Sequence, residues 1–207
     1  MDLLTEHWQR AGFAGKLPTK VNAFIDLFLK WNKSINLSAA RDREALAEHV
    51  ADCFYFAARV PGSAATMIDV GAGGGLPGVL VAITRPQTVV MSIEPVHKKH
   101  AFLRTAAREL GLTNYDARAE RIEDHPTRNY DVAGSRATWA LDEWMARGQT
   151  LVRPGGLVLG MEAAITFDVP GMQHWPYEFL GKKRAIVGLT VAATQAQPSL
   201  AHDTPQG

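Results

Sequence analysis

Two segments near the start of the chain carry apolar residues at helical spacing. In the first, apolar side chains recur at i, i+3, i+4, i+7 and i+8 with polar residues between them: Val21, Phe24, Ile25, Phe28 and Leu29. A second stripe starts near Asp42, runs from Leu46 to Ala57, and is ended by Pro61-Gly62. The first sixty residues are therefore predicted to be helical.

From residue 66 the pattern changes to short apolar runs that alternate with helical ones. The runs typical of strands are Met67–Val70, Thr88–Ile93, Tyr115–Ala119, Tyr130–Ala133 and Leu157–Met161. The runs typical of helices are Leu76–Ile83, Val96–Leu110 and Leu141–Val152. This alternation predicts an α/β fold with a doubly wound, mostly parallel sheet covered on both faces, and an N-terminal helical extension. We expect a helical region at 1–62, a core at 63–193 and a disordered tail at 194–207.

Composition narrows the class of protein. The chain has 207 residues, of which 46% are hydrophobic and 21% charged, as expected for one folded domain rather than a disordered chain. A single cysteine excludes an internal disulfide and a cysteine-based zinc site, and we expect no metal. We find no apolar run long enough to span a membrane, and the first ten residues lack the order of a signal peptide, so we expect a cytoplasmic protein.

Charge gives no strong indication of a polyanionic partner. The formal net charge is +1, which neither predicts nor excludes binding to nucleic acid. Two local clusters of cationic residues stand out: Lys16, Lys20, Lys30, Lys33, Arg41 and Arg43 form one, and Lys182, Lys183 and Arg184 form the other. The simpler interpretation is that they lie on solvated helix faces and in a turn.

The most informative segment is the glycine-rich stretch at residues 67–78, MIDVGAGGGLPG. It leads from an apolar strand through Asp69 and the glycines Gly71, Gly73 and Gly75 into a helix. Glycine permits a tight turn and lets a ligand touch the main chain, and such a turn lies at the ligand-binding edge of a doubly wound sheet. The segment therefore predicts a ligand site.

Two ligands compete for this loop. Gly73, Gly75 and Gly78 satisfy the G-x-G-x-x-G pattern of dinucleotide-binding proteins, in which a helix N-terminus faces a pyrophosphate. Asp69 would repel a pyrophosphate but suits a ligand with a positive amino group. S-adenosylmethionine has an ammonium and a sulfonium and no phosphate, so the acidic loop favours this cofactor.

Two later strand ends offer further contacts to such a ligand. Glu94 follows the second strand, 23 residues after Gly71, where a carboxylate can accept hydrogen bonds from both ribose hydroxyls. This feature is shared by proteins that bind nicotinamide dinucleotides. The third strand leads into Ala119 and Glu120, which could meet an adenine edge.

Several motifs together resemble one family, the 16S ribosomal RNA guanine-N7 methyltransferases called RsmG or GidB. They span roughly Val21 to Gly156. The matching segments are Lys30–Ser38 (W-N-x-x-x-N-L-[ST]), His49–Asp52 (H-x-x-D), Asp69–Gly78 with its Leu-Pro-Gly ending, Lys98–Leu103 (K-[KR]-x-x-F-L), Arg118–Glu120, Ser135–Ala137 and Pro154–Gly156.

The resemblance implies a class I methyltransferase fold, S-adenosylmethionine as cofactor and 16S ribosomal RNA of the small subunit as partner. It also implies site residues. The methionine part would lie against Gly71, Gly73, Gly75 and Leu76 with Asp69 near its ammonium, the ribose against Glu94, and the adenine between Ala119 and Glu120. Arg136 would be the catalytic residue, next to the methyl group and the incoming base. We expect the protein to be a monomer.

The chain departs from the family pattern at two positions. Glu162 stands where a lysine is usual, and Pro95 replaces a serine after the ribose carboxylate. Three alternatives stay open: a methyltransferase of the same fold acting on another RNA site or a small molecule, a nicotinamide-dependent protein, and a non-catalytic RNA-binding module.

His49 and Asp52 lie one helical turn apart, and a polar contact between helices and sheet is the simplest interpretation of the pair.

Overall fold

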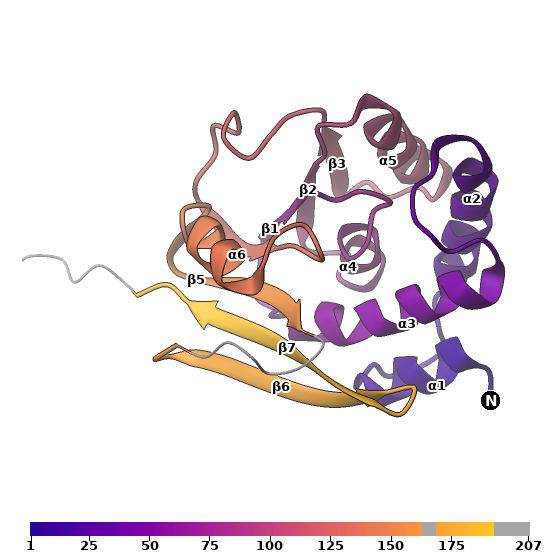
Figure 1. Cartoon of the computed structure of the whole chain (residues 1–207), viewed down its shortest axis with the longest axis horizontal. Coiled ribbons are helices and arrows are strands. Elements are labelled where there is room, and N and C mark those ends of the chain that lie inside the picture. Colours follow the sequence, from indigo (N-terminus) through magenta and orange to yellow (C-terminus); the bar gives the residue numbers. More distant parts are fainter. Residues whose placement is uncertain (163–168, 193–207) are drawn as a thin grey trace, which may run out of the picture.

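The computed structural model describes residues 1–162 and 169–192 of the chain. Three helices come first, and strands and helices then alternate before a C-terminal hairpin (Figure 1). The helices are α1 (Leu3–Arg10), α2 (Thr19–Ile35), α3 (Arg43–Arg59), α4 (Gly78–Thr84), α5 (His97–Glu109) and α6 (Leu141–Gln149). The strands are β1 (Thr66–Val70), β2 (Val89–Ile93), β3 (Tyr115–Arg118), β4 (Tyr130–Gly134), β5 (Val152–Glu162), β6 (Met172–Phe179) and β7 (Lys182–Thr190).

The strands form one seven-stranded sheet in the order β3-β2-β1-β4-β5-β7-β6. β1 to β5 are parallel to one another, whereas β7 is antiparallel to both of its neighbours. The strand order reverses between β1 and β4, because β1 pairs with β2 on one side and with β4 on the other. The carboxyl ends of β1 and β4 therefore border the crevice in which doubly wound sheets bind ligands.

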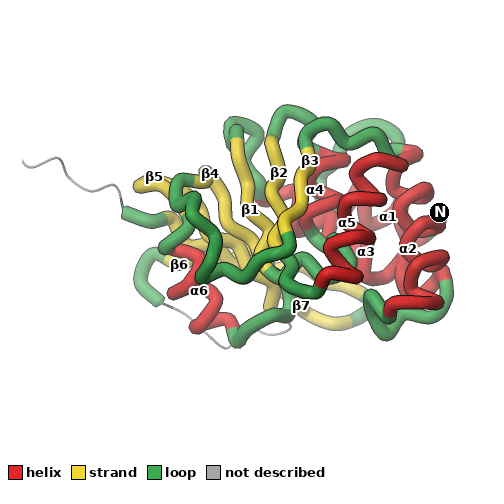
Figure 2. The backbone as a smooth tube through the Cα atoms, turned by 90° about the horizontal axis from the view of Figure 1, so that it is seen from above, coloured by secondary structure: helices red, strands yellow, loops and turns green. Residues whose placement is uncertain are grey.

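One face of the sheet carries most of the helices. A single cluster of buried apolar side chains joins all five helices α1 to α5 to the side chains of this face, such as Met67, Val90 and Val132. On the other face, a second cluster includes Ile68 and the side chains of α6. The predicted covering of both faces is thus uneven, because the connection between β3 and β4 contains no helix (Figure 2).

The helical boundaries follow local chemistry. The Asp2 and Asp42 side chains accept hydrogen bonds from the backbone N–H groups of Thr5 and Ala45, which caps α1 and α3. α2 ends at Asn36, which has a left-handed backbone with φ of 54°. The predicted elements agree with the structure to within a few residues at most ends, although β5 starts at Val152 where helix was predicted.

The hairpin of β6 and β7 is absent from our sequence-based predictions. It is joined through Leu180 and Gly181, which both have positive φ. The division into a helical region and a core at residue 62 stays a prediction. In the structure, α1 to α3 share one cluster of buried apolar side chains with the sheet. The predicted disordered tail at 194–207 lies outside the described residues. In the part of the chain that is described, no helix has the length and apolar character needed to cross a membrane.

Candidate functional site

The glycine loop between β1 and α4 forms the centre of the site. Gly71, Gly73 and Gly75 have φ of +69°, +55° and +86°, a conformation that residues with a side chain rarely adopt. The loop is tied to β2, since the backbone N–H groups of Gly71 and Ala72 both donate to the Ile93 carbonyl, at 3.0 and 3.2 Å. The sequence thus produces a tight, hydrogen-bonded turn with partly exposed main chain at the carboxyl end of β1.

Asp69 lies beneath this loop with only 1% of its surface exposed. Its Oδ2 accepts hydrogen bonds from the Gly78 backbone N–H at 3.0 Å and from the Ser92 hydroxyl at 3.4 Å. Its Oδ1 is buried without a hydrogen-bond partner among the described residues. Burial raises the pKa of this carboxyl to about 7, against the lowering effects of the two hydrogen bonds and of Arg136.

This arrangement decides between the two ligands that the loop motif allowed. The first N–H group of α4, which a pyrophosphate would need, already donates to the Asp69 carboxylate. A side-chain carbon on Gly78 would lie 2.4 Å from Asp69 Oδ2, so this glycine is required by the carboxylate rather than by a phosphate. Because the Asp69 carboxylate beneath the loop accepts from this N–H group, the loop favours a ligand with a cationic amino group over a pyrophosphate.

Glu94 lies at the carboxyl end of β2 and is 4% exposed. Its two carboxylate oxygens accept hydrogen bonds from the backbone N–H groups of Gly73 and Val96, at 2.8 and 2.9 Å. These bonds fix the carboxylate against the glycine loop. Each oxygen keeps a second lone pair that can accept from a ligand hydroxyl.

A cavity of about 480 Å³ opens above the glycine loop. It is lined by the loop, the end of β2, the start of α5, the helical region and the segment after β4. The lining residues are Phe28, Leu37, Ser38, His49, Gly71, Ala72, Gly73, Gly74, Leu76, Glu94, Pro95, Lys99, Arg136, Ala137 and Thr138. We call this the cofactor cavity.

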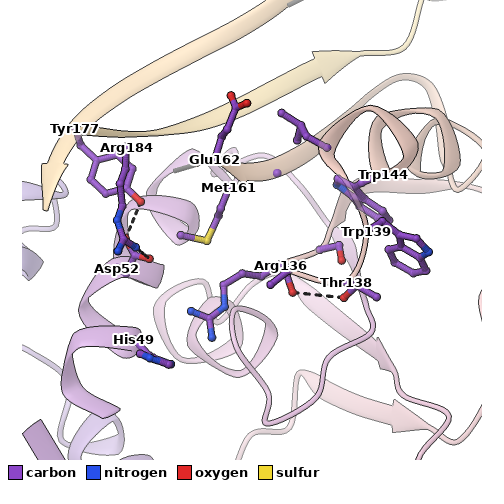
Figure 3. A pocket seen from close by; sticks show the side chains of 14 residues that line it. His49, Asp52, Arg136, Thr138, Trp139, Trp144, Met161, Glu162, Tyr177 and Arg184 are labelled. Atoms are coloured by element: carbon purple, nitrogen blue, oxygen red, sulfur yellow. Dashed lines mark hydrogen bonds and ion pairs between the residues drawn. The ribbon is translucent and has the colours of Figure 1, made fainter. Parts of the chain in front are cut away.

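A second cavity of about 380 Å³ lies between α3, the segment after β4, the end of β5 and the hairpin (Figure 3). Its lining residues are His49, Asp52, Ser135, Arg136, Ala137, Thr138, Trp139, Leu141, Trp144, Gly160, Met161, Glu162, Tyr177 and Arg184. We call this the acceptor cavity. The two cavities share His49, Arg136, Ala137 and Thr138, so they meet at these residues.

Arg136 and His49 lie on opposite sides of this junction. In Figure 3 the Arg136 side chain extends from the segment after β4 toward the imidazole of His49 on α3. Within residues 1–162 and 169–192, no carboxylate forms an ion pair with the Arg136 guanidinium, which therefore can bind a ligand. Burial and the nearby Arg136 charge lower the pKa of His49, so its imidazole is neutral at neutral pH.

The acceptor cavity is closed on one side by contacts between α3 and the hairpin. The Tyr177 hydroxyl donates to Asp52 Oδ1 at 2.7 Å, and Arg184 forms an ion pair with the other oxygen. The rings of Tyr55 and Tyr177 stack with centroids 4.0 Å apart. These contacts confirm the predicted polar link between helix and sheet for Asp52.

The predicted cofactor residues fall into two groups. Gly71, Gly73, Leu76, Glu94 and Arg136 line the cofactor cavity. Asp69 and Gly75 lie beneath or behind the loop, and a side-chain carbon on Gly75 would meet Val79 and Leu103.

The predicted adenine residues lie outside the lining of the cofactor cavity. Ala119 is exposed beyond the end of β3, while Glu120 is partly buried and pairs with the buried His125. The Glu94 backbone N–H donates to the Arg118 carbonyl at 3.0 Å, which brings this segment next to the end of β2.

Our sequence analysis missed the contribution of the helical region to the cofactor cavity. Phe28, Leu37 and Ser38 come from α2 and the segment after it. Gly74 makes room for them, because a side-chain carbon there would lie 2.4 Å from the Phe28 ring. The Lys30–Ser38 segment, which resembles the family motif, contains two of these residues, Leu37 and Ser38.

Comparison with known proteins identifies the family. The chain is 37% identical to the ribosomal RNA small subunit methyltransferase G of Neisseria gonorrhoeae over 161 residues, or 74% of this chain and 77% of that protein. It is 34% identical to the protein of the same name in Bordetella pertussis over 194 residues, or 87% and 82% of the two chains.

Solved structures support the fold alone. The O-methyltransferase of Bacillus cereus, in complex with SAH, superposes with a TM-score of 0.59 at 13% identity, covering 90% of this chain and 96% of that one. The O-methyltransferase TomG of Streptomyces achromogenes, in complex with SAM, gives 0.56 at 13% identity, with 91% and 99% covered.

The family model described as "GidB: rRNA small subunit methyltransferase G" matches residues 18–174, a range that contains the glycine loop and most residues of both cavities. The chain therefore belongs to the GidB (RsmG) family of S-adenosylmethionine-dependent methyltransferases.

Proposed function

We propose that this chain transfers the methyl group of S-adenosylmethionine to N7 of a guanine in 16S ribosomal RNA. Family membership supplies the class of reaction and the RNA. The observation that carries the assignment of the site is the meeting of the two cavities at Arg136 and His49. One cavity borders the acidic glycine loop, and the other has room for a base next to it.

The cofactor cavity fits S-adenosylmethionine better than a dinucleotide. We assign the methionine part to the main chain of Gly71 and Gly73 and to Leu76, with Gly75 shaping the turn. The buried Asp69 carboxylate attracts the ammonium group electrostatically from beneath the loop. The Glu94 oxygens, held by Gly73 and Val96, accept hydrogen bonds from the ribose hydroxyls.

The adenine is assigned to the segment after β3, where Ala119 and Glu120 follow the strand next to Glu94. The support is the hydrogen bond between Glu94 and Arg118, which joins the two strand ends. The pairing of Glu120 with the buried His125 restricts the conformation of this segment.

The reaction requires positioning more than acid–base catalysis. S-adenosylmethionine, when bound, supplies a methyl group activated by its sulfonium. Guanine N7 has an exposed lone pair and needs no general base, so the chain must hold the base in line at about 3–3.5 Å and exclude water. The residues shared by the two cavities are placed to do this, and Arg136 can stack on the base or hold a phosphate beside it.

The substrate is expected to be an accessible nucleotide in the small subunit. N7 faces the deep, narrow major groove of an A-form helix, which side chains cannot enter, so the target guanine must lie in a loop or be displaced from its stack. We further propose that the chain acts in the cytoplasm, where the subunits are, and as a monomer, because one chain lines both cavities.

The test is to incubate the protein with labelled S-adenosylmethionine and small subunits that lack the modification, and then to map the label. The proposal predicts label on N7 of one guanine of 16S ribosomal RNA and none with Arg136→Ala. Label at another position, or on a small molecule only, would favour another methyltransferase activity of this fold. The presence of Glu162 in the acceptor cavity is the observation that favours this second activity.

Binding to the RNA gives an independent check. If several phosphates are contacted, the affinity for small-subunit RNA must fall steeply as salt rises. A flat salt response would contradict a polyanionic substrate.

A further inference from the structure

One polar side chain at the junction of the two cavities has no partner in the structure. His49 Nδ1 is buried without a hydrogen-bond partner among the described residues. A buried nitrogen without a partner destabilises a protein unless a ligand or water supplies one. The imidazole also lines both cavities, so a ligand that spans them would touch it.

Burial, Arg136 and Arg184 lower the pKa of His49, against the opposite effect of Asp52 and Glu48. Arg136 faces it from the segment after β4 and Arg184 from β7, while Asp52 and Glu48 lie on the same helix. Burial is the largest influence and lowers the pKa, and the two arginines act in the same direction. A neutral imidazole offers one N–H donor without adding positive charge next to a base that becomes cationic on methylation.

The position of His49 indicates which edge of the base it contacts. Methyl transfer places N7 at the junction of the cavities, because the methyl group arrives from the cofactor side. The atom next to N7 on the same edge of guanine is O6, a hydrogen-bond acceptor, whereas adenine carries an amino donor there. A donor at the junction therefore meets O6, and the opposite edge of the base points away into the acceptor cavity.

We propose that His49 is a specificity-determining residue that donates a hydrogen bond to O6 of the target guanine. This inference rests on the proposed function. The bond fixes the rotation of the base so that N7 faces the methyl group, and it is lost with a base that has no O6. Sites that hydrogen-bond a substrate group discriminate strongly against analogues that lack it.

The experiment separates O6 recognition from general packing. Small subunits are reassembled with 16S ribosomal RNA whose mapped target guanine is kept or replaced by hypoxanthine, which retains O6, or by 2-aminopurine, which lacks it. Transfer of labelled methyl is measured as kcat/KM for the wild type, His49→Ala and His49→Phe. The phenylalanine variant retains a ring of similar size without a donor, and Glu44→Ala on the exposed first turn of α3 serves as the control.

The wild type is expected to prefer guanine and hypoxanthine over 2-aminopurine. Both His49 variants should lower kcat/KM for guanine and hypoxanthine about 10- to 100-fold and leave 2-aminopurine nearly unchanged. Comparing each variant with the wild type on the same base cancels differences in the reactivity of N7. The melting temperature of His49→Phe should be no lower than that of the wild type, because this variant retains a ring of similar size and removes a nitrogen that has no partner among the described residues.

The inference is overturned if either variant slows all three bases by the same factor, or if the preference for O6 persists in both. A loss of melting temperature that accompanies an equal loss on all bases would show that His49 only supports the fold. Failure of the proposed function is distinct, since the wild type would then transfer no label to guanine in the RNA at all.

Discussion

The buried Asp69 carboxylate leads to a prediction about pH, stability and ligand binding. Burial raises its pKa to about 7 in the folded protein, from an ordinary value of 3.8 for an exposed aspartate. Because the folded pKa is raised, this group contributes stability that is fully present below about pH 4 and is lost as pH rises through 7. The difference between these two pKa values corresponds to a change on the order of 4 kcal/mol in the free energy of unfolding.

Asp69→Asn removes this titration and keeps an oxygen that can accept from the Gly78 N–H. The variant should therefore be more stable than the wild type at pH 8, by up to a few kcal/mol, and the difference should shrink toward pH 4. Urea denaturation at several pH values measures it. The comparison with the variant is needed because burial also lowers the pKa values of His7 and His49. These two histidines make the wild type less stable as pH falls, which is opposite to the effect of Asp69.

The affinity for the ligand should also depend on the ionisation of Asp69. An ammonium group near the loop stabilises the charged carboxylate and so lowers its pKa, which releases protons on binding between pH 6 and 7. Each unit by which the pKa falls corresponds to a tenfold gain in affinity at high pH. Calorimetry with S-adenosylhomocysteine in two buffers of different ionisation enthalpy should detect released protons for the wild type and none for Asp69→Asn, which should bind weakly at every pH.

Two results would refute this reasoning. The first is a wild-type protein that becomes more stable, relative to Asp69→Asn, as pH rises from 5 to 8. The second is an affinity of Asp69→Asn for S-adenosylhomocysteine that equals that of the wild type. The first result would show that burial does not raise the pKa of this carboxyl, and the second would show that the carboxylate does not contribute to ligand binding.

Three further changes test individual parts of the site. Glu94→Gln should weaken S-adenosylhomocysteine binding about 10- to 100-fold in calorimetry, because a charged acceptor is lost; unchanged affinity would remove Glu94 from the ribose site. Gly71→Ala should lower the free energy of unfolding by roughly 1–3 kcal/mol, because its side-chain carbon would lie 2.6 Å from Thr138 in a left-handed backbone; a wild-type urea midpoint would contradict this. Asp52→Ala should destabilise by roughly 2–3 kcal/mol by leaving the partly buried Tyr177 and Arg184 side chains without an acceptor; a loss below about 0.5 kcal/mol would mean that the hairpin is held by packing alone.

The central strands and the glycine loop were predictable from the sequence for a physical reason. Buried parallel strands require continuous apolar runs, and the tight turn after β1 requires glycines, so both leave a local pattern. The same is true of α2, whose apolar stripe faces the core. Glu94 could be singled out from the sequence because it follows directly after a recognisable strand, whereas Arg136 was indicated only by the resemblance to the family.

The hairpin, and the part of the helical region that lines the cofactor cavity, could not be predicted in this way. β6 contains Pro176 and many polar residues, and it is stabilised by pairing with β7 rather than by an apolar pattern of its own. The approach of Phe28 to Gly74 depends on how α2 packs against the loop, 46 residues along the chain. The partner of Asp52 is equally remote, because Arg184 lies 132 residues away. Contacts of this kind depend on the tertiary structure.

The most direct test of the account is a crystal structure of the protein with S-adenosylhomocysteine, grown in the presence of excess NAD as a competitor. The account predicts the methionine part against Gly71 and Gly73, both ribose hydroxyls on the Glu94 carboxylate, and the sulfur facing Arg136 and His49 at the opening of the acceptor cavity. A dinucleotide on the loop, or S-adenosylhomocysteine bound elsewhere with Glu94 uncontacted, would contradict it.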